Sequence, residues 1–286
     1  MEGMASRPRR RPLICAAWSI ALLAALLPSS AHPDQPPLSA SQSGKGEPTI
    51  VLIHGIGQDR RVWNRVAPAL ERRFRVVRVD LPGHGQSAPV GSPTVTTVAQ
   101  ALDRTLREKK VRQAVLVGHS YGALVALEEA AAHPDRVGGI VAIDMATFLS
   151  ADPERIAEMD QFLTERYALF LRAVFGGMTR DSSLVDSVVS WAGYVSRPVL
   201  SDYFRDAWSA DLRGRIQNVK APILLILTDA IWPWAESWTS ARTRLGYETA
   251  GPTVGRRIGE SGHLMPLDQP DSLSAAIEGF ASALQK

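Results

Sequence analysis

The pentapeptide Gly-His-Ser-Tyr-Gly at positions 118–122 restricts the possible folds of this chain more than any other feature. It follows a short apolar run, Ala114–Val117, and opens a stretch with helical periodicity that continues to Ala132. A Gly-x-Ser-x-Gly pattern between a strand and a helix is typical of a nucleophile elbow, a tight turn in which side chains at both glycine positions would collide with neighbouring backbone. A serine at a helix N-terminus also lies beside N–H groups that stabilise developing negative charge. The pattern therefore predicts that Ser120 is a nucleophile.

Strand-like and helix-like segments alternate along the chain from residue 49 onward. We expect six strands, at Thr49–Ile53, Arg75–Val79, Ala114–Val117, Gly139–Ile143, Ile223–Leu227 and Thr253–Ile258. Helical periodicity is found at Val62–Leu70, Val98–Glu108, Tyr121–Ala132 and Asp271–Leu284. This alternation predicts an α/β fold with a mainly parallel sheet of about six to eight strands flanked by helices. Functional side chains in such sheets gather beyond the carboxyl ends of the strands.

The segment 145–218 interrupts the alternation. It is helical in character, contains no convincing strand and carries ten aromatic residues, most of which we expect to serve ordinary core packing. Because it lies between two expected strands, we predict that it forms a helical cap over the strand ends. The core then consists of residues 48–144 and 219–286, and the 286 residues form one domain with an insertion.

The first 31 residues have the pattern of a secretory signal peptide. Four arginines precede an apolar run, Leu13–Leu27, which is followed by small residues ending at Ala31. A run of this length is short for a bilayer-spanning helix, which needs about 20 residues. We therefore expect cleavage near Ala31 and an exported protein without stable membrane insertion. An uncleaved anchor is the alternative, and the choice between the general secretory and twin-arginine routes stays open.

The basic character of the chain comes from this leader. The formal charge is +3, but without residues 1–31 the chain holds 28 basic and 28 acidic residues. No basic block remains that would favour nucleic acid as a partner. The only cysteine, Cys15, also leaves with the leader, so export would impose no disulfide chemistry. Residues 32–47, rich in Pro, Ser, Gln and Gly, are expected to be a flexible lead-in.

Three further segments, together with the elbow, resemble the α/β-hydrolase family. They are Val-Leu-Ile-His-Gly at 51–55, Asp-Leu-Pro-Gly-His-Gly-Gln-Ser at 80–87 and Ser-Gly-His at 261–263. The resemblance covers nearly all of the chain from Pro48, with the cap inserted after the sixth family strand. It implies that the backbone N–H groups of Ile56 and Tyr121 form an oxyanion hole. Family members often have two earlier strands, but residues 32–48 are too polar and Pro-rich for them, which leaves six core strands.

The same resemblance assigns the base and leaves two choices for the acid. The family order of Ser, acid and His selects His263, which follows the last expected strand. Asp229 directly follows the strand Ile223–Leu227, where the acid of the family usually lies, although the turn is about two residues tighter than usual. Asp144, at the end of the preceding strand, is the alternative acid, and Glu236 is a distant third. We favour Asp229 on strand position and chain order.

These residues predict acyl transfer to water through a covalent acyl-enzyme. The substrate would be a small-molecule carboxylic ester, with an apolar group suggested by the aromatic cap. No His, Asp or Cys cluster has metal-ligand spacing, so we expect neither a metal nor a cofactor. Members of the family that the chain resembles have Asp at the elbow when they open epoxides or displace halide, so the resemblance implies that Ser120 argues against both chemistries. A cofactor-free perhydrolase, a lactonase, a thioesterase, a carbon–carbon hydrolase and a non-catalytic ligand-binding protein remain as alternatives. The oligomeric state is left open.

Overall fold

The computed structural model describes residues 36–149 and 151–285. The predicted signal peptide at 1–31 and the first part of the predicted lead-in lie outside these residues. In the described part of the chain, no helix has the length and apolar character that crossing a membrane requires.

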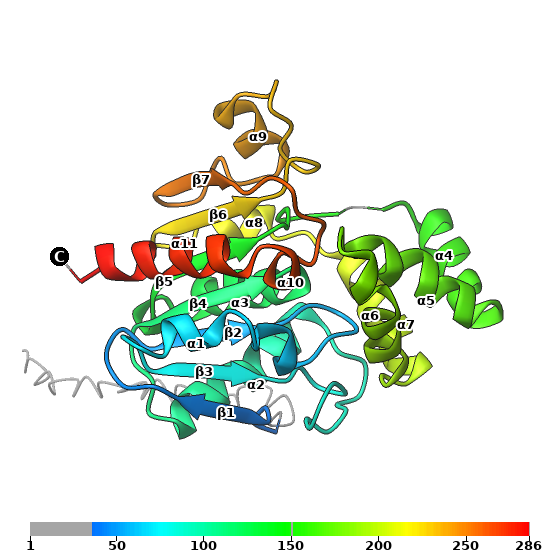
Figure 1. The fold of residues 1–286 in the computed structure, drawn as a ribbon, viewed down its shortest axis with the longest axis horizontal. Coiled ribbons are helices and arrows are strands. Elements are labelled where there is room, and N and C mark those ends of the chain that lie inside the picture. Colours follow the sequence, from blue (N-terminus) through cyan, green and yellow to red (C-terminus); the bar gives the residue numbers. More distant parts are fainter. Residues whose placement is uncertain (1–35, 150, 286) are drawn as a thin grey trace, which may run out of the picture. The chain divides into compact units, whose positions relative to one another are not determined.

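Seven strands form one sheet, in which the lateral order is β1-β3-β2-β4-β5-β6-β7 (Figure 1). The strands are β1 (Ala40–Ser43), β2 (Ile50–Ile53), β3 (Val76–Val79), β4 (Ala114–His119), β5 (Val137–Ile143), β6 (Ile223–Leu227) and β7 (Thr253–Arg257). All neighbouring pairs are parallel except β1 with β3. The mainly parallel α/β sheet of six to eight strands is confirmed.

The edge strand β1 corrects the expectation of a flexible lead-in without strands. Ala40 pairs with Val79 of β3 in antiparallel register. Leu38, just before β1, is buried, and its N–H donates to Thr105 Oγ1 over 2.7 Å. A polar sequence can form this strand because an edge strand pairs through its backbone and leaves its side chains partly exposed. The sheet therefore has one strand more than the six expected.

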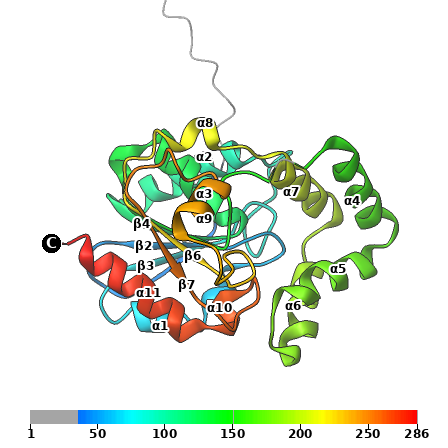
Figure 2. The same ribbon diagram turned by 90° about the horizontal axis from the view of Figure 1, so that it is seen from above.

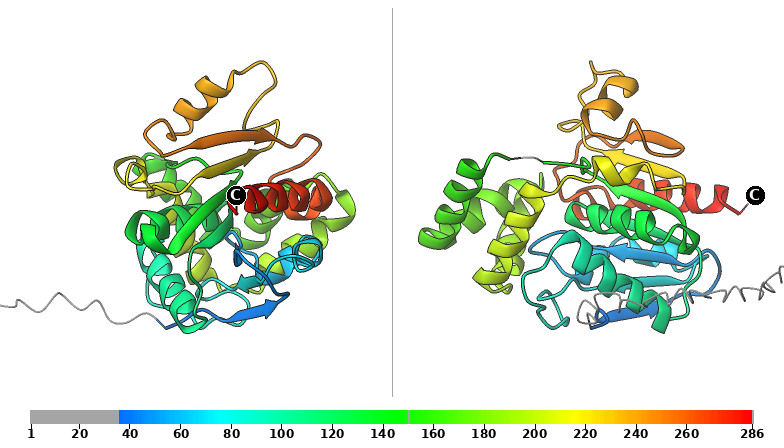
Figure 3. Two further views of the ribbon diagram at one scale, coloured as in Figure 1. Left: turned by 90° about the vertical axis from the view of Figure 1, so that its left-hand side faces the viewer. Right: turned by 180° about the vertical axis from the view of Figure 1, so that it is seen from behind.

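Helices cover both faces of the sheet, which explains why the central strands are apolar on both sides (Figure 2). On one face lie α1 (Ala67–Leu70), α10 (Met265–Asp268) and α11 (Pro270–Ala283), and on the other α2 (Val95–Glu108), α3 (Tyr121–Ala132) and α8 (Arg213–Ile216). The two faces are seen in Figure 1 and in the right-hand view of Figure 3. The remaining core elements are α9 (Trp238–Arg244) and the 3₁₀ helices η1 (Arg60–Trp63) and η2 (Pro134–Arg136). All residues of β2, β4 and β6 are buried.

Between β5 and β6 the chain forms a helical cap beyond the carboxyl ends of the strands (Figure 1). The cap contains α4 (Pro153–Glu165), α5 (Tyr167–Phe175), η3 (Gly176–Met178), η4 (Ser182–Leu184), α6 (Val185–Gly193) and α7 (Arg197–Ser209). Its incoming and outgoing segments are joined by an antiparallel bridge between Phe148 and Asp211. The N–H of Leu212 also donates to the carbonyl of Thr147 over 2.9 Å. Both ends of the cap are thereby tied together at its base.

Aromatic side chains fill the interior of the cap. The rings of Phe170 and Phe204 meet edge to face, with centroids 5.3 Å apart, and Phe204 stacks on Trp208 at 5.1 Å. Phe170 is fully buried and Phe204 nearly so. These contacts agree with the expectation that most aromatics of the segment pack a core.

Candidate active site

The backbone at Ser120 has the strained turn expected of a nucleophile elbow. Its φ of 54° and ψ of −124° lie outside the regions that a residue with a Cβ adopts readily. The Ser120 N–H donates to the carbonyl of Ile143 over 2.9 Å, so the turn is still held by the sheet. A Cβ at position 118 would lie 2.2 Å from the Gly122 carbonyl oxygen, and one at position 122 would lie 2.4 Å from that of Ile53. Both glycines are therefore required by close backbone contacts.

His263 lies beside the elbow and contacts Asp144. Its Nδ1 is 2.7 Å from Asp144 Oδ2. The second carboxylate oxygen of Asp144 accepts hydrogen bonds from Thr228, from the N–H at 2.9 Å and from the hydroxyl at 2.8 Å. Burial alone raises the pKa of Asp144, but the hydrogen bonds from His263 and Thr228 bring the pKa below its usual value. An ionised, oriented carboxylate thus faces the imidazole.

The favoured pairing of Asp229 with His263 is corrected by this geometry. Asp229 Oδ1 accepts a hydrogen bond from the guanidinium of Arg180 over 2.9 Å, and its side chain is one-quarter exposed. The physical reason is the tight turn after β6. Thr228, the first residue after the strand, binds Asp144 with both of its donors, and the chain then carries Asp229 toward the cap. The alternative acid, Asp144, is the one that reaches the histidine.

The backbone around His263 is held from both sides. The His263 carbonyl lies 2.7 Å from Nε2 of His119, the residue that precedes the nucleophile, and the two rings are 4.8 Å apart. The N–H of Gly262 donates to Asp268 Oδ2 over 2.7 Å. Within residues 36–149 and 151–285, no hydrogen bond joins the Ser120 hydroxyl to His263. Such bonds are often long without substrate and tighten when it binds.

The loop after β2, which carries Ile56, passes close to the nucleophile. A Cβ at Gly55 would lie 3.0 Å from Ser120 Cβ, so the loop passes directly over the serine. Gly57, in the same loop, has a φ of 71°, which lies in the left-handed region that favours glycine. In the described part of the chain, the N–H of Ile56 has no hydrogen-bond acceptor. Tyr121 is the first residue of α3, where backbone N–H groups lack intrahelical acceptors. Both N–H groups are available to an oxyanion.

Three buried histidines fasten the backbone around this site. Burial lowers the pKa of His54 to about 4 and the pKa of His84 and His119 to about 3, so all three are neutral near pH 7. His54 bridges the Gly55 carbonyl, 2.7 Å from Nδ1, and the Leu81 N–H, 2.9 Å from Nε2. His54 therefore orders the backbone of both segments. The roles of His84 and His119 have no signal in the sequence, because their partners lie 27 and 144 positions away.

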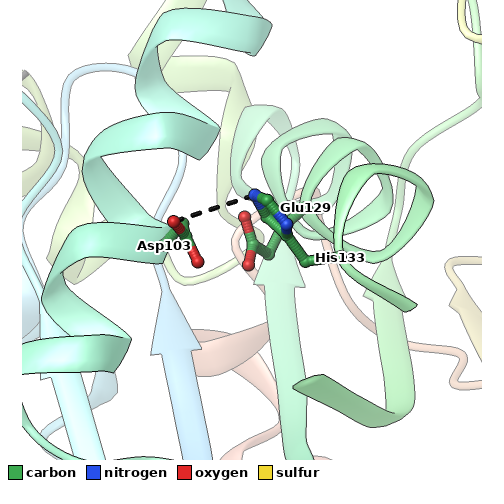
Figure 4. Close-up of side chains that lie close together, drawn as sticks. All are labelled: Asp103, Glu129 and His133. Carbon is green, nitrogen blue, oxygen red and sulfur yellow. Dashed lines mark ion pairs between the residues drawn. The ribbon is translucent and has the colours of Figure 1, made fainter. Parts of the chain in front are cut away.

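A separate cluster of Asp103, Glu129 and His133 lies between α2 and α3, at the end of α3 remote from Ser120 (Figure 4). One ligand atom from each residue lies within 4.8 Å of the others, so the expectation that no cluster has ligand geometry is corrected. The spacing of Glu129 and His133 by four positions on one helix face was its only sequence signal. Asp103 also contacts Arg107 and Arg136, the latter over 3.0 Å.

The burial of Glu129 is the other unusual feature of this cluster. Glu129 is fully buried, and neither of its carboxylate oxygens has a hydrogen-bond partner among the described residues. Burial, together with the neighbouring Asp103, raises the pKa of Glu129 to about 8. The guanidinium groups beside Asp103 already supply positive charge to the cluster. We therefore interpret Glu129 as a buried, protonated acid at neutral pH.

The fold and the elbow together define a hydrolase of the α/β class, and comparisons with known proteins agree. Residues 50–276 match the family model described as the alpha/beta hydrolase family. The chain is 31% identical over 263 residues to a pimeloyl-(acyl-carrier protein) methyl ester esterase of Methylococcus capsulatus, covering 84% of this chain and 97% of that protein. This chain belongs to the α/β hydrolase family.

Solved structures of low sequence identity share the fold. An enol-lactonase from Burkholderia xenovorans superposes with a TM-score of 0.74 at 21% identity, covering 86% of this chain and 96% of that chain. A bromoperoxidase from Bacillus anthracis superposes with a TM-score of 0.76 at 20% identity, covering 85% and 94%. Since their names differ in chemistry, these likenesses speak for the fold and not for a substrate.

Proposed function

We propose that this protein hydrolyses carboxylic esters through a catalytic triad of Ser120, His263 and Asp144. The observation that carries the proposal is the 2.7 Å contact between His263 Nδ1 and a buried, hydrogen-bonded Asp144 carboxylate, next to the serine elbow. A carboxylate in this position orients the imidazole and stabilises its protonated form. Membership of a family with named esterase relatives supports the same activity.

The mechanism follows from the positions of these groups. His263 Nδ1–H donates to Asp144, which leaves Nε2 as the base that accepts the proton of the Ser120 hydroxyl as its oxygen attacks the ester carbonyl. The N–H groups of Ile56 and Tyr121 donate to the oxyanion of the tetrahedral intermediate. His263 then protonates the leaving alcohol, and an acyl-enzyme remains on Ser120. Water, deprotonated by His263, attacks this ester and releases the acid.

Covalent labelling tests the nucleophile directly. A fluorophosphonate should modify wild-type protein at Ser120, which peptide mass spectrometry would locate, and should leave Ser120→Ala unmodified. The variant should also lose turnover of p-nitrophenyl esters. A wild-type protein that neither reacts with the probe nor hydrolyses any ester would instead favour a non-catalytic ligand-binding protein.

We propose a small-molecule ester with an apolar portion as the substrate. The aromatic content of the cap, which lies over the strand ends, supports this choice. The relatives are named as esterases of a pimeloyl-(acyl-carrier protein) methyl ester. A panel of p-nitrophenyl esters of increasing chain length, with methyl esters, a lactone and a peroxide assay, would separate esterase from lactonase and perhydrolase activity.

We also propose export, on the basis of the basic head, short apolar run and small residues at the N-terminus. The protein recovered from outside the cytoplasm should have an N-terminus near His32, which N-terminal sequencing would show. Secreted material that still begins at Met1 would contradict cleavage.

A further inference from the structure

Cap helix α7 touches the residue that directly follows the nucleophile. The hydroxyl of Tyr121 donates to Asp206 Oδ2 over 2.7 Å, and Tyr121 is completely buried. The same oxygen of Asp206 accepts the N–H of Val95 over 2.8 Å, so the carboxylate is itself tied to the start of α2. Because the backbone N–H of Tyr121 is one proposed oxyanion donor, a contact that fixes its ring also restricts the direction of that N–H.

The same helix reaches the second proposed donor through two buried rings. Tyr203, three residues before Asp206 on α7, meets the ring of His84 edge to face, with centroids 4.8 Å apart and planes at 88°. The Tyr203 hydroxyl donates to the Pro82 carbonyl over 3.0 Å. His84 Nδ1 contacts the same carbonyl at 3.1 Å. Helix α7 therefore braces His84 through both its ring and its backbone partner.

His84 in turn holds the loop that carries Ile56. Its Nε2 accepts the N–H of Gly57 over 3.1 Å. A neutral imidazole with its proton on Nδ1 satisfies both contacts, because it donates to the Pro82 carbonyl and accepts from Gly57. This hydrogen bond therefore fixes the backbone of the residue that follows the proposed donor, Ile56.

The contacts made through Tyr121 and those made through Tyr203 are also joined to each other. The rings of Tyr121 and Tyr203 contact edge to face at 5.0 Å, and both are fully buried. His54 continues this series of ring contacts, since the centroids of the His54 and His84 rings are 5.3 Å apart. One continuous set of side chains thus joins α7 to both segments of the proposed oxyanion hole.

We propose that Asp206 of the cap is a positioning residue for the oxyanion hole, acting through Tyr121, with Tyr203 packed between Tyr121 and His84 on the same helix. The inference rests on the proposed function. It makes the cap more than a cover for the substrate, because helix α7 restricts the direction of the Tyr121 N–H donor. Asp206 does not touch the reacting atoms, so its effect should fall on transition-state binding and spare ground-state binding.

The test compares substitutions that remove the contact with one that preserves it. Tyr121→Phe removes the hydroxyl and keeps the backbone donor, and Asp206→Ala removes the acceptor. Asp206→Asn keeps one carbonyl oxygen, which is all that the two hydrogen bonds use. Asp202→Ala, on the same helix, is the matched control, since Asp202 pairs with Arg205 over 3.6 Å.

We expect Tyr121→Phe and Asp206→Ala to lower kcat by about 10-fold with KM nearly unchanged, less than the 10²–10³-fold effect of losing an oxyanion donor outright. Their affinity for a boronic acid that mimics the tetrahedral intermediate should fall by a similar factor. Asp206→Asn should recover most of the kcat and of the inhibitor affinity, and Asp202→Ala should behave as wild type.

Two outcomes would overturn the inference. One is wild-type kcat and inhibitor affinity in both Tyr121→Phe and Asp206→Ala. The other is an Asp206→Asn variant as impaired as Asp206→Ala, which would mean that the accepting oxygen does not matter. If Asp206→Ala does not fold, Tyr121→Phe alone decides, since it removes a single hydroxyl. Failure of the proposed function looks different, because wild type itself would then neither hydrolyse esters nor react with a fluorophosphonate at Ser120.

Discussion

At the scale of single residues, the choice between two aspartates depends on which of them Thr228 holds. Thr228 directs its N–H and its hydroxyl at Asp144, and Asp144 is left with one oxygen for His263. Asp229, the next residue in the chain, pairs with Arg180 of the cap. Thr228 and Asp229 are adjacent in one turn, but Thr228 orients the carboxylate that faces the imidazole, whereas Asp229 contacts the cap.

This division predicts different effects for two isosteric substitutions. Asp144→Asn should lower kcat by about 10³–10⁴-fold, because the neutral amide cannot stabilise the imidazolium or hold the correct tautomer of His263. Asp229→Asn should keep kcat within about threefold of wild type, since it weakens only a partly exposed contact with Arg180. Steady-state kinetics on a p-nitrophenyl ester would measure both. Collapse of the Asp229→Asn variant with retention by Asp144→Asn would reverse the assignment.

At the scale of elements, the interface between α2 and α3 contains an acid, Glu129, that titrates. Glu129 of α3 is fully buried beside Asp103 of α2, and its pKa is raised to about 8. In the unfolded chain the group ionises near its usual pKa of 4.5. Between these values the native state holds a proton that the unfolded state has lost. The contribution of Glu129 to stability is therefore fully present below pH 4.5 and is lost as pH rises toward 8.

Replacement of Glu129 by its neutral amide should remove this loss of stability at high pH. Glu129→Gln should match wild type near pH 5 and melt roughly 3–10 °C higher than wild type at pH 8, a gain of roughly 1–3 kcal/mol. Thermal unfolding followed by circular dichroism at both pH values would show it. Glu108→Gln, an exposed acid on α2, is the control and should change neither Tm. A Glu129→Gln variant less stable than wild type at pH 8 would mean that the carboxylate is ionised and has a cationic partner.

The predictability of each strand follows from its place in the sheet. The six strands β2 to β7 were expected within a few residues of their ends. For β2, β4, β5 and β6 the reason is a continuous apolar run between turn residues, which is typical of strands covered on both faces. The edge strand β1 was missed. Its sequence, Ala-Ser-Gln-Ser, has no hydrophobic pattern, because one neighbour, β3, supplies its pairing through the backbone alone.

At the scale of the whole molecule, a change in pH alters the contributions of the buried histidines and of Glu129 to stability in opposite directions. His54, His84 and His119 have a pKa of about 3 to 4 in the native state and are usually near 6.5. When pH falls from 6.5, the unfolded chain takes up protons that the native chain excludes. Their contribution is present above pH 6.5 and is lost as pH falls toward 4, the reverse of the effect of Glu129.

The free energy of unfolding should therefore decline on both sides of a maximum near neutral pH. Urea unfolding at intervals from pH 4.5 to 8.5 would measure the curve. His84→Gln, which cannot take up a proton, should lose less stability between pH 7 and pH 5 than wild type does. A free energy of unfolding that stays constant from pH 7 to pH 5 would contradict burial of three neutral imidazoles.

The family order of Ser, acid and His selected His263 among six histidines, whereas local patterns in the chain were sufficient for the sheet class and the serine elbow. Each of these last two rests on short stretches whose chemistry is complete in itself, such as the two glycines that only a tight turn demands. The acid was not chosen correctly in this way. Asp144 and Asp229 both follow strands and both lie between Ser120 and His263 in the chain, so the preference for Asp229 depended on its strand position in the family. Only the lateral packing of β5 against β6, with Thr228 between the two carboxylates, directs one toward the imidazole. The meeting of α7 with the oxyanion segments likewise appears only when residues some 80 to 120 positions apart come into contact.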